Sequence, residues 1–239
     1  MSHNGIDTSD RDVTDRSTAA EPTALVVIAH HRSDSLTAHI ARRTIQRLES
    51  TGHKVDVLDL RAEDFDPRMT AADQPDWGNR DKPYSPEVHA QMDRVLAADL
   101  IVAVFPVYWA SVPALLKGWI DRVWNYGFAY GRSRPRLAGK RMLWLGLAGV
   151  AAADPVVDFL QQSLEGQLNM GIAYYCGLEF STVGLLPDAE ERRQRLNSDG
   201  TLQIDEATVG AERVAQYTAL EQRAEEFLTD FLTATPVLA

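Results

Sequence analysis

Five short apolar runs, separated by segments of helical periodicity, constrain the fold of this chain more than any other feature. Each run is continuous rather than alternating and several are rich in β-branched residues, which is typical of strands buried on both faces of a parallel sheet. The runs cover residues 24–30, 55–60, 99–105, 141–147 and 178–185. Alternation of strands and helices predicts an α/β fold, in which right-handed crossovers place helices on both faces of one parallel sheet.

The segments between the runs carry apolar side chains three or four positions apart, as amphipathic helices do. The predicted helices cover residues 36–48, 85–97, 112–123, 155–176 and 214–231. Residues 61–83 are different, because they contain turn-forming residues without periodicity (Pro67, Pro75, Gly78 and Pro83). We therefore expect a long irregular connection there, and connections of this length often have a functional role.

The first 22 residues differ in composition from the rest of the chain. They hold five acidic residues and two arginines, with few apolar side chains. Such a segment cannot bury enough apolar surface to fold, so we expect a disordered acidic tail at residues 1–22. Residues 23–239 have a length that suits one domain.

Composition also disfavours several classes of protein. A formal net charge of −10 argues against a nucleic-acid partner. No apolar run approaches the roughly 20 residues needed to span a bilayer, and the N-terminus does not resemble a signal peptide, so we expect a cytoplasmic protein. Cys176 is the single cysteine, which leaves no disulfide and no zinc cluster. Adjacent strand residues point to opposite faces, so we do not expect His30 and His31 to share a metal.

The loop after the first run, from His30 to Thr37, contains no glycine. A nicotinamide-binding Rossmann unit would place a glycine-rich motif here, so that fold is disfavoured. The loop has basic and hydroxyl side chains followed by the start of a helix, whose free N–H groups suit a phosphate. The alternative is that Ser33, Asp34 or Ser35 only caps the helix.

The loop after the third run places Tyr108 and Trp109 between Pro106 and Pro113. Aromatic side chains at the carboxyl end of a strand expose apolar surface, which favours a binding site for a flat ring. The alternative is that Trp109 belongs to the core or to a dimer interface. Trp119 and Trp124 lie on or beside the apolar stripe of the next helix and are expected to be core residues.

Residues 105–130, FPVYWASVPALLKGWIDRVWNYGFAY, resemble the signature of the flavodoxin-like NAD(P)H:quinone oxidoreductases. This is the DT-diaphorase family, which includes bacterial ancillary oxidoreductases of potassium-efflux systems. The segment from Ala29 to Thr37, the Asp59-Leu60 pair with Phe65-Asp66-Pro67 after it, and Cys176-Gly177 match as well. The resemblance covers about residues 24–185.

The resemblance implies a flavodoxin-like three-layer sandwich whose five-stranded parallel sheet has the order 2-1-3-4-5. Residues 23–239 would form one flavin-binding domain. It implies a homodimer with the active site at the subunit interface, bound FAD or alternatively FMN, and NAD(P)H as electron donor. The implied reaction is two-electron, ping-pong reduction of a quinone or a related electron-poor aromatic compound.

The resemblance also implies roles for individual residues. The flavin phosphate region would be held by His30, Ser35, Leu36 and Thr37. The flavin ring would be lined by Pro106, Val107, Tyr108, Trp109 and Ala110, and its pyrimidine end by Leu147, Ala148, Gly149 and Val150. The substrate pocket would receive Phe128, Ala129 and Tyr130 from the partner subunit. Trp109 as ring wall and Tyr130 as acceptor contact would be the residues closest to the chemistry.

The chain departs from the family pattern after the fourth run. Leu147 and Ala148 stand where two threonines are usual, and the Tyr and His assigned to hydride transfer or protonation are missing between Gly149 and Gly171. These departures leave the acceptor and the proton donor open. They also motivate an alternative function, a regulatory flavoprotein subunit that docks on a potassium-efflux transporter.

Overall fold

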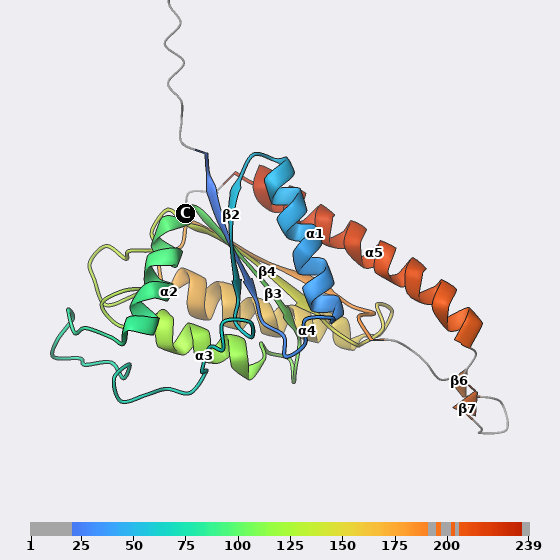
Figure 1. Cartoon of the computed structure of the whole chain (residues 1–239), viewed down its shortest axis with the longest axis horizontal. Helices are drawn as coiled ribbons and strands as arrows, with labels where there is room; N and C mark the ends of the chain where they lie inside the picture. The colour runs from blue at the N-terminus through green and yellow to red at the C-terminus, as the bar shows by residue number, and fades with distance from the viewer. Residues whose placement is uncertain (1–20, 191–194, 197–201, 204–205, 236–239) are drawn as a thin grey trace, which may run out of the picture.

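The computed structural model describes residues 21–190, 195–196, 202–203 and 206–235. Most of the predicted acidic tail lies outside these residues. One parallel sheet organises the chain, with the order β2-β1-β3-β4-β5 (Figure 1), so the predicted fold class is confirmed. Its strands are β1 (Thr23–Ile28), β2 (Lys54–Asp59), β3 (Leu100–Pro106), β4 (Arg141–Leu147) and β5 (Phe180–Leu186).

Continuous burial of the central strands explains why their sequences do not alternate. All seven residues of β3 are buried, because side chains on both faces of the sheet are covered. Leu25 and Val27 of β1 pack into one core cluster, while Ala24 and Val26 pack into the other. The alternate side chains of one strand thus supply two cores, one on each face of the sheet.

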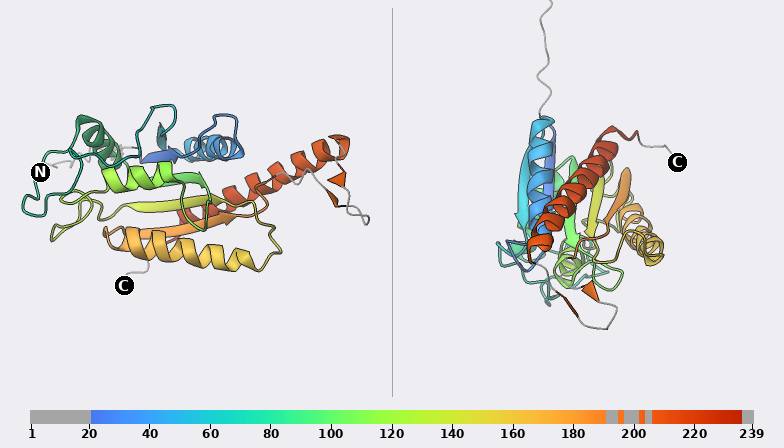
Figure 2. Two further views of the ribbon diagram at one scale, coloured as in Figure 1. Left: turned by 90° about the horizontal axis from the view of Figure 1, so that it is seen from below. Right: turned by 90° about the vertical axis from the view of Figure 1, so that its right-hand side faces the viewer.

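Helices cover both faces of this sheet (Figure 2). They are α1 (Leu36–Ser50), α2 (Pro86–Ala97), α3 (Ala114–Val123), α4 (Val156–Leu164), the π-helix η1 (Glu165–Tyr174) and α5 (Glu206–Thr233). A small antiparallel pair, β6 (Arg195–Leu196) and β7 (Leu202–Gln203), precedes α5. Side chains of α1 and α5 pack in the second cluster, and those of α2, α3, α4 and η1 pack in the first.

The predicted helix at residues 155–176 is one continuous helical segment, but its second half is a π-helix. Gly166 and Gly171 lie in this half, and a Cβ atom built on Gly171 would lie 3.4 Å from the Gly166 carbonyl oxygen. Glycine has low helix propensity, and its small size permits a wider turn. Apolar spacing does not separate the two helix types, so this change could not be predicted from the spacing.

The long connection between β2 and α2 runs beside α3, outside the layered core (Figure 1). It approaches α3 so closely that a Cβ atom on Gly118 would lie 2.2 Å from the Pro67 carbonyl oxygen. A glycine at position 118 is therefore required for this packing.

Candidate functional site

The carboxyl ends of β1, β3 and β4 meet at one edge of the sheet, because these strands are parallel neighbours. Backbone hydrogen bonds continue past the strands and tie the following loops together. The Ala29 N–H donates to Val104 O at 3.1 Å, and the Val107 N–H donates to Leu147 O at 2.7 Å. The loops that the sequence singled out after β1, β3 and β4 are thus adjacent, as expected for a ligand site in an open parallel sheet.

A tight turn at residues 108–111 is the most unusual feature of this edge. Tyr108 and Ser111 exchange two backbone hydrogen bonds, each 3.0 Å long. The two central residues, Trp109 and Ala110, have φ values of 51° and 57°. Positive φ at both central positions is typical of a type I′ turn, where glycine or asparagine is usual. Each of these residues is therefore strained by roughly 1–2 kcal/mol.

Contacts with η1 hold the strained turn in place. The Ser111 hydroxyl donates to the Gln167 side-chain oxygen at 2.8 Å, and the Gln167 amide donates to Ala110 O at 3.5 Å. Within the part of the chain that the structure describes, the backbone N–H groups of Trp109 and Ala110 have no hydrogen-bond partner. Strain that the surroundings maintain, next to free donors, is characteristic of ligand-binding turns.

Trp109 is 100% exposed, and Tyr108 is 45% exposed. The interpretation of Trp109 as a core residue is therefore wrong for this chain. Trp119 and Trp124 are buried, as predicted, and their rings pack edge to face with centroids 6.0 Å apart.

A cavity of about 710 Å³ lies beside this turn. Six of the predicted cofactor residues line it: Val107, Trp109, Ala110, Ala148, Gly149 and Val150. The side chain of Leu147 instead packs in the second core cluster, and Pro106 is the buried last residue of β3. A ligand in the cavity would meet the backbone of that region rather than these two side chains.

Sequence reasoning missed three further residues that line this cavity: Phe159, Leu160 and Glu190. The first two come from α4, and the third follows β5. A Cβ atom on Gly149 would lie 2.3 Å from the Glu190 carboxyl carbon, so a larger residue at position 149 would displace this side chain. These three residues reach the cavity through tertiary packing across the edge of the sheet. No local sequence pattern indicates such packing.

The loop after β1 wraps the amino end of α1. Ser35 is the N-cap of α1, and its hydroxyl accepts from the Ala38 N–H at 3.1 Å. Of the three residues considered as the cap, Ser35 is therefore the one that caps α1. Among the described residues, the N–H groups of Leu36 and Thr37 have no hydrogen-bond partner, so they stay available to an anion.

The two histidines of this loop do not lie on opposite faces, because β1 ends at Ile28. Their rings stack with centroids 4.3 Å apart, so the geometric argument about His30 and His31 is wrong. Burial of the ring, with the charge of His31 beside it, lowers the pKa of His30 below its ordinary value. Within the described ranges, no group of three or more His, Cys, Asp and Glu side chains is arranged to hold a metal.

The three residues predicted to contact the substrate follow α3, and they differ in exposure. Phe128 and Ala129 are buried in the first core cluster, whereas Tyr130 is only partly buried. Phe128 and Ala129 therefore offer no side-chain surface to a ligand in this protomer. Tyr130 follows the carboxyl end of α3 and Trp109 precedes its amino end, and a helix of this length spans about 15 Å.

Tyr130 belongs to an aromatic cluster that consists of Trp77, Tyr126, Tyr130 and Tyr175. The Tyr130 ring lies 5.9 Å from Tyr126 and 5.4 Å from Tyr175, measured between centroids. Trp77 packs edge to face on Tyr126 at 5.0 Å. The sequence analysis did not find this cluster, because its members come from three segments far apart in the chain.

Titratable groups around these features are few. Burial, with Tyr175 beside it, raises the pKa of Tyr130, so its hydroxyl stays protonated and can donate a hydrogen bond near neutral pH. Burial raises the pKa of the Cys176 thiol to about 11, which agrees with a packing role rather than a nucleophile. The site therefore offers apolar side chains and backbone donors, and among the residues that line its cavity Glu190 carries a titratable group.

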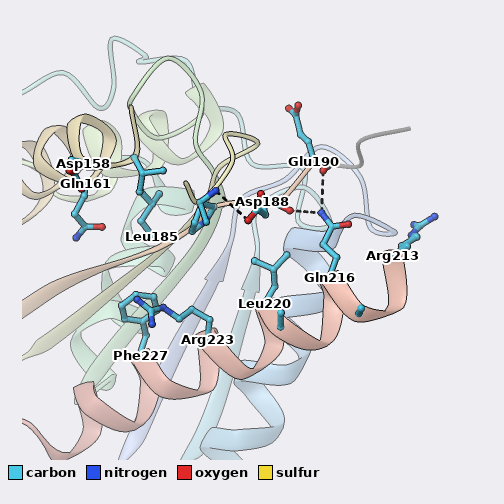
Figure 3. A pocket seen from close by; sticks show the side chains of 15 residues that line it. Asp158, Gln161, Leu185, Asp188, Glu190, Arg213, Gln216, Leu220, Arg223 and Phe227 are labelled. Carbon is cyan, nitrogen blue, oxygen red and sulfur yellow. Dashed lines mark hydrogen bonds between the residues drawn. The ribbon is translucent and has the colours of Figure 1, made fainter. Parts of the chain in front are cut away.

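A larger cavity, of about 990 Å³, lies at the edge of β5 between α4 and α5 (Figure 3). Asp158, Gln161, Leu185, Leu220 and Phe227 are among its lining residues. Neither the loop after β1 nor the loop after β3 contributes to it, although Glu190 lines both cavities. The larger cavity is therefore built from other loops than the strand-end site, and its size is no reason to assign it to that site.

Comparisons with known proteins agree with this geometry. Residues 22–204 match the model of a family described as the flavodoxin-like fold. The chain is 43% identical over 164 residues to YcaK, an uncharacterised NAD(P)H oxidoreductase of Escherichia coli, covering 67% of this chain and 81% of that protein. It is 29% identical over 197 residues to a mouse ribosyldihydronicotinamide dehydrogenase [quinone], covering 71% and 85%.

A solved structure of an NAD(P)H:quinone oxidoreductase from Methanothermobacter marburgensis superimposes with a TM-score of 0.73. The match covers 92% of this chain and all of that chain, at 20% sequence identity, and so supports the fold. In the described part of this chain, every helix is too short or too polar to cross a membrane.

Proposed function

The chain belongs to the flavodoxin-like fold family, and from this premise we propose that it is a flavin-dependent NAD(P)H:quinone oxidoreductase that acts in the cytoplasm. Related electron-poor aromatic compounds would serve as acceptors in the same way. The observation that carries the proposal is the strained turn at residues 108–111, with an exposed tryptophan and two free N–H groups beside a cavity. No feature of the described residues favours the regulatory subunit over the reductase.

The residues of the strand-end site fit a flavin. The cavity of about 710 Å³ has a size that is ordinary for a cofactor pocket, and seven of the nine residues that line it have apolar side chains. Backbone donors at Trp109 and Ala110 suit the oxygen and nitrogen acceptors at the polar edge of a flavin ring. His30 and the amino end of α1, at Ser35, Leu36 and Thr37, suit the phosphate. We propose FAD, with FMN as the alternative.

A bound flavin supplies two-electron hydride chemistry, which no side chain can supply alone. The turn at residues 108–111 would orient the ring, and Trp109 would cover it and exclude water. NAD(P)H and the acceptor would occupy the same open face in succession, which is a ping-pong sequence. The Tyr130 hydroxyl, which is protonated near neutral pH as tyrosine hydroxyls are, would donate a hydrogen bond to an acceptor oxygen.

This role for Tyr130 suits a homodimer. In the chain, α3 lies between Trp109 and Tyr130, and a helix of its length spans about 15 Å. The outer surface of α4 and η1 exposes large apolar side chains, including Phe159, Met170 and Tyr174 at 61%, 64% and 75% exposure. A second copy that covers this surface would bury it and bring Tyr130 of the partner subunit to the flavin.

Purified protein tests the proposal directly. As purified, or after incubation with FAD or FMN, it should show flavin absorption that bleaches when NAD(P)H is added and returns when a quinone is added. Heat release followed by mass measurement identifies the cofactor. A folded protein that binds neither flavin would rule out the proposed function.

A further inference from the structure

The connection between β2 and α2 is fixed by a buried ionic contact with α3. Asp73 is fully buried, and Arg122 of α3 is 2% exposed. Their side chains pair at 2.8 Å, and Glu87 pairs with the same guanidinium at 2.6 Å. Asn125 donates to the Asp73 backbone carbonyl at 2.6 Å. Breaking a buried contact of this kind is strongly unfavourable, so the backbone near Asp73 is firmly held.

A second attachment lies seven residues further along the connection. Gly127 has a φ of 78°, and a Cβ atom there would lie 1.9 Å from Arg80 O. Arg132 then pairs with Asp81 and also donates to the Gly127 carbonyl. Only glycine permits the first of these contacts, because it has no Cβ atom and tolerates positive φ. The segment between Asp73 and Asp81 is therefore held at both ends.

Trp77 lies between these two attachments and is 68% exposed. The Trp77 ring packs edge to face on the Tyr126 ring, with the two centroids 5.0 Å apart. The centroid of the Trp77 ring lies 6.4 Å from that of the Tyr130 ring. A large apolar side chain exposed on a connection that is fixed on either side offers a flat surface on which an aromatic ligand can stack. Its neighbour Tyr130 is the residue that the proposed function places at the acceptor.

We propose that Trp77 is a specificity-determining residue that extends the acceptor-binding surface of Tyr130. This inference rests on the proposed function. Acceptors with two or more fused rings reach past Tyr130 and stack on Trp77, whereas a single-ring acceptor contacts Tyr130 alone. The chain therefore prefers multi-ring quinones and aromatic compounds of similar size.

Steady-state kinetics of Trp77→Ala with two acceptors tests this assignment. The KM for 1,4-naphthoquinone should rise about five- to tenfold relative to wild type, as expected when one aromatic stacking contact is lost. The KM for 1,4-benzoquinone should differ from its own wild-type value by less than about twofold. Each acceptor is compared with itself between variants, so differences in redox potential cancel. Trp77→Phe should restore most of the naphthoquinone affinity.

Met69→Ala serves as the matched control, because Met69 is an exposed apolar residue of the same connection outside the segment held by Asp73 and Asp81. It should leave both KM values unchanged. Flavin content should be unchanged in all variants, and Met69→Ala should also leave the rate of flavin reduction by NAD(P)H unchanged. A wild-type protein without flavin reduction would contradict the proposed function itself. Normal wild-type turnover, with equal KM changes for both acceptors or none in Trp77→Ala, would overturn the role of Trp77 alone.

Discussion

Two adjacent regions of this molecule use the same residue type in opposite ways. Trp119, on α3, is fully buried and packs against Trp124. Trp109, ten residues earlier in the turn after β3, is fully exposed on a backbone with positive φ. Packing within the chain accounts for the burial of the Trp119 ring. Contacts with η1 hold the backbone of the turn, but no packing within the described residues covers the Trp109 ring, which leaves its surface open to a ligand.

The turn and the helix also differ in how their backbones are satisfied. Helix α3 is regular and ends at Val123, and the N–H of its C-cap residue Trp124 donates to Ile120 O at 2.9 Å. The turn holds two non-glycine residues in a left-handed conformation and leaves their N–H groups free. The backbone of α3 is therefore in its most stable conformation. The backbone of the turn is strained, and this strained conformation leaves the N–H groups of Trp109 and Ala110 free to bind a ligand.

Trp119→Ala should have the largest effect on stability. Removal of a fully buried tryptophan leaves a cavity in the first core cluster, so the free energy of unfolding should fall by roughly 3–5 kcal/mol. Chemical denaturation measures this change. A loss below about 1 kcal/mol would show that α3 is not the packed region described above.

Ala110→Gly should have a smaller effect of opposite sign. Glycine adopts positive φ without strain, so the free energy of unfolding should rise by about 0.5–1 kcal/mol. Retention of flavin should weaken, because a glycine turn is less rigid in the binding conformation. Denaturation of the flavin-free protein and a flavin titration measure the two effects.

Ala138→Gly is the control for this substitution. Ala138 is an exposed turn residue whose φ is not positive, so the same change should only destabilise the protein slightly. If Ala110→Gly lowers stability as Ala138→Gly does, the turn is not strained.

The sheet could be predicted because burial on both faces leaves a direct signature, a continuous apolar run. The order of the strands came from the resemblance of residues 105–130 to a known family, and the structure confirms it. Helix starts at Ser35 and Ser85 were also predictable, since both serines cap their helices. The exposure of Tyr108 and Trp109 could be anticipated from their place between two prolines at a strand end.

Other features have no local signal. Tryptophan and alanine rarely adopt positive φ, so the type of turn at residues 108–111 could not be predicted. The stacking of His30 on His31 depends on where β1 ends. Burial of Phe128 and the contact of Trp77 with Tyr126 arise from packing between segments about 50 residues apart. Tertiary contacts of this range leave no periodic pattern in the sequence.

Trp109→Ala should have the smallest effect on stability and the largest effect on the cofactor. Its side chain contributes nothing to the core, so the free energy of unfolding of the flavin-free protein should change by less than about 0.5 kcal/mol. The most direct measurement is the flavin stoichiometry of the folded protein, beside the thermal midpoint with and without saturating flavin, with Trp119→Ala as control. We expect Trp109→Ala to keep its flavin-free midpoint and lose flavin, and Trp119→Ala to lose stability while its folded fraction keeps flavin. A folded Trp109→Ala variant with wild-type flavin content would contradict the placement of the cofactor at this turn.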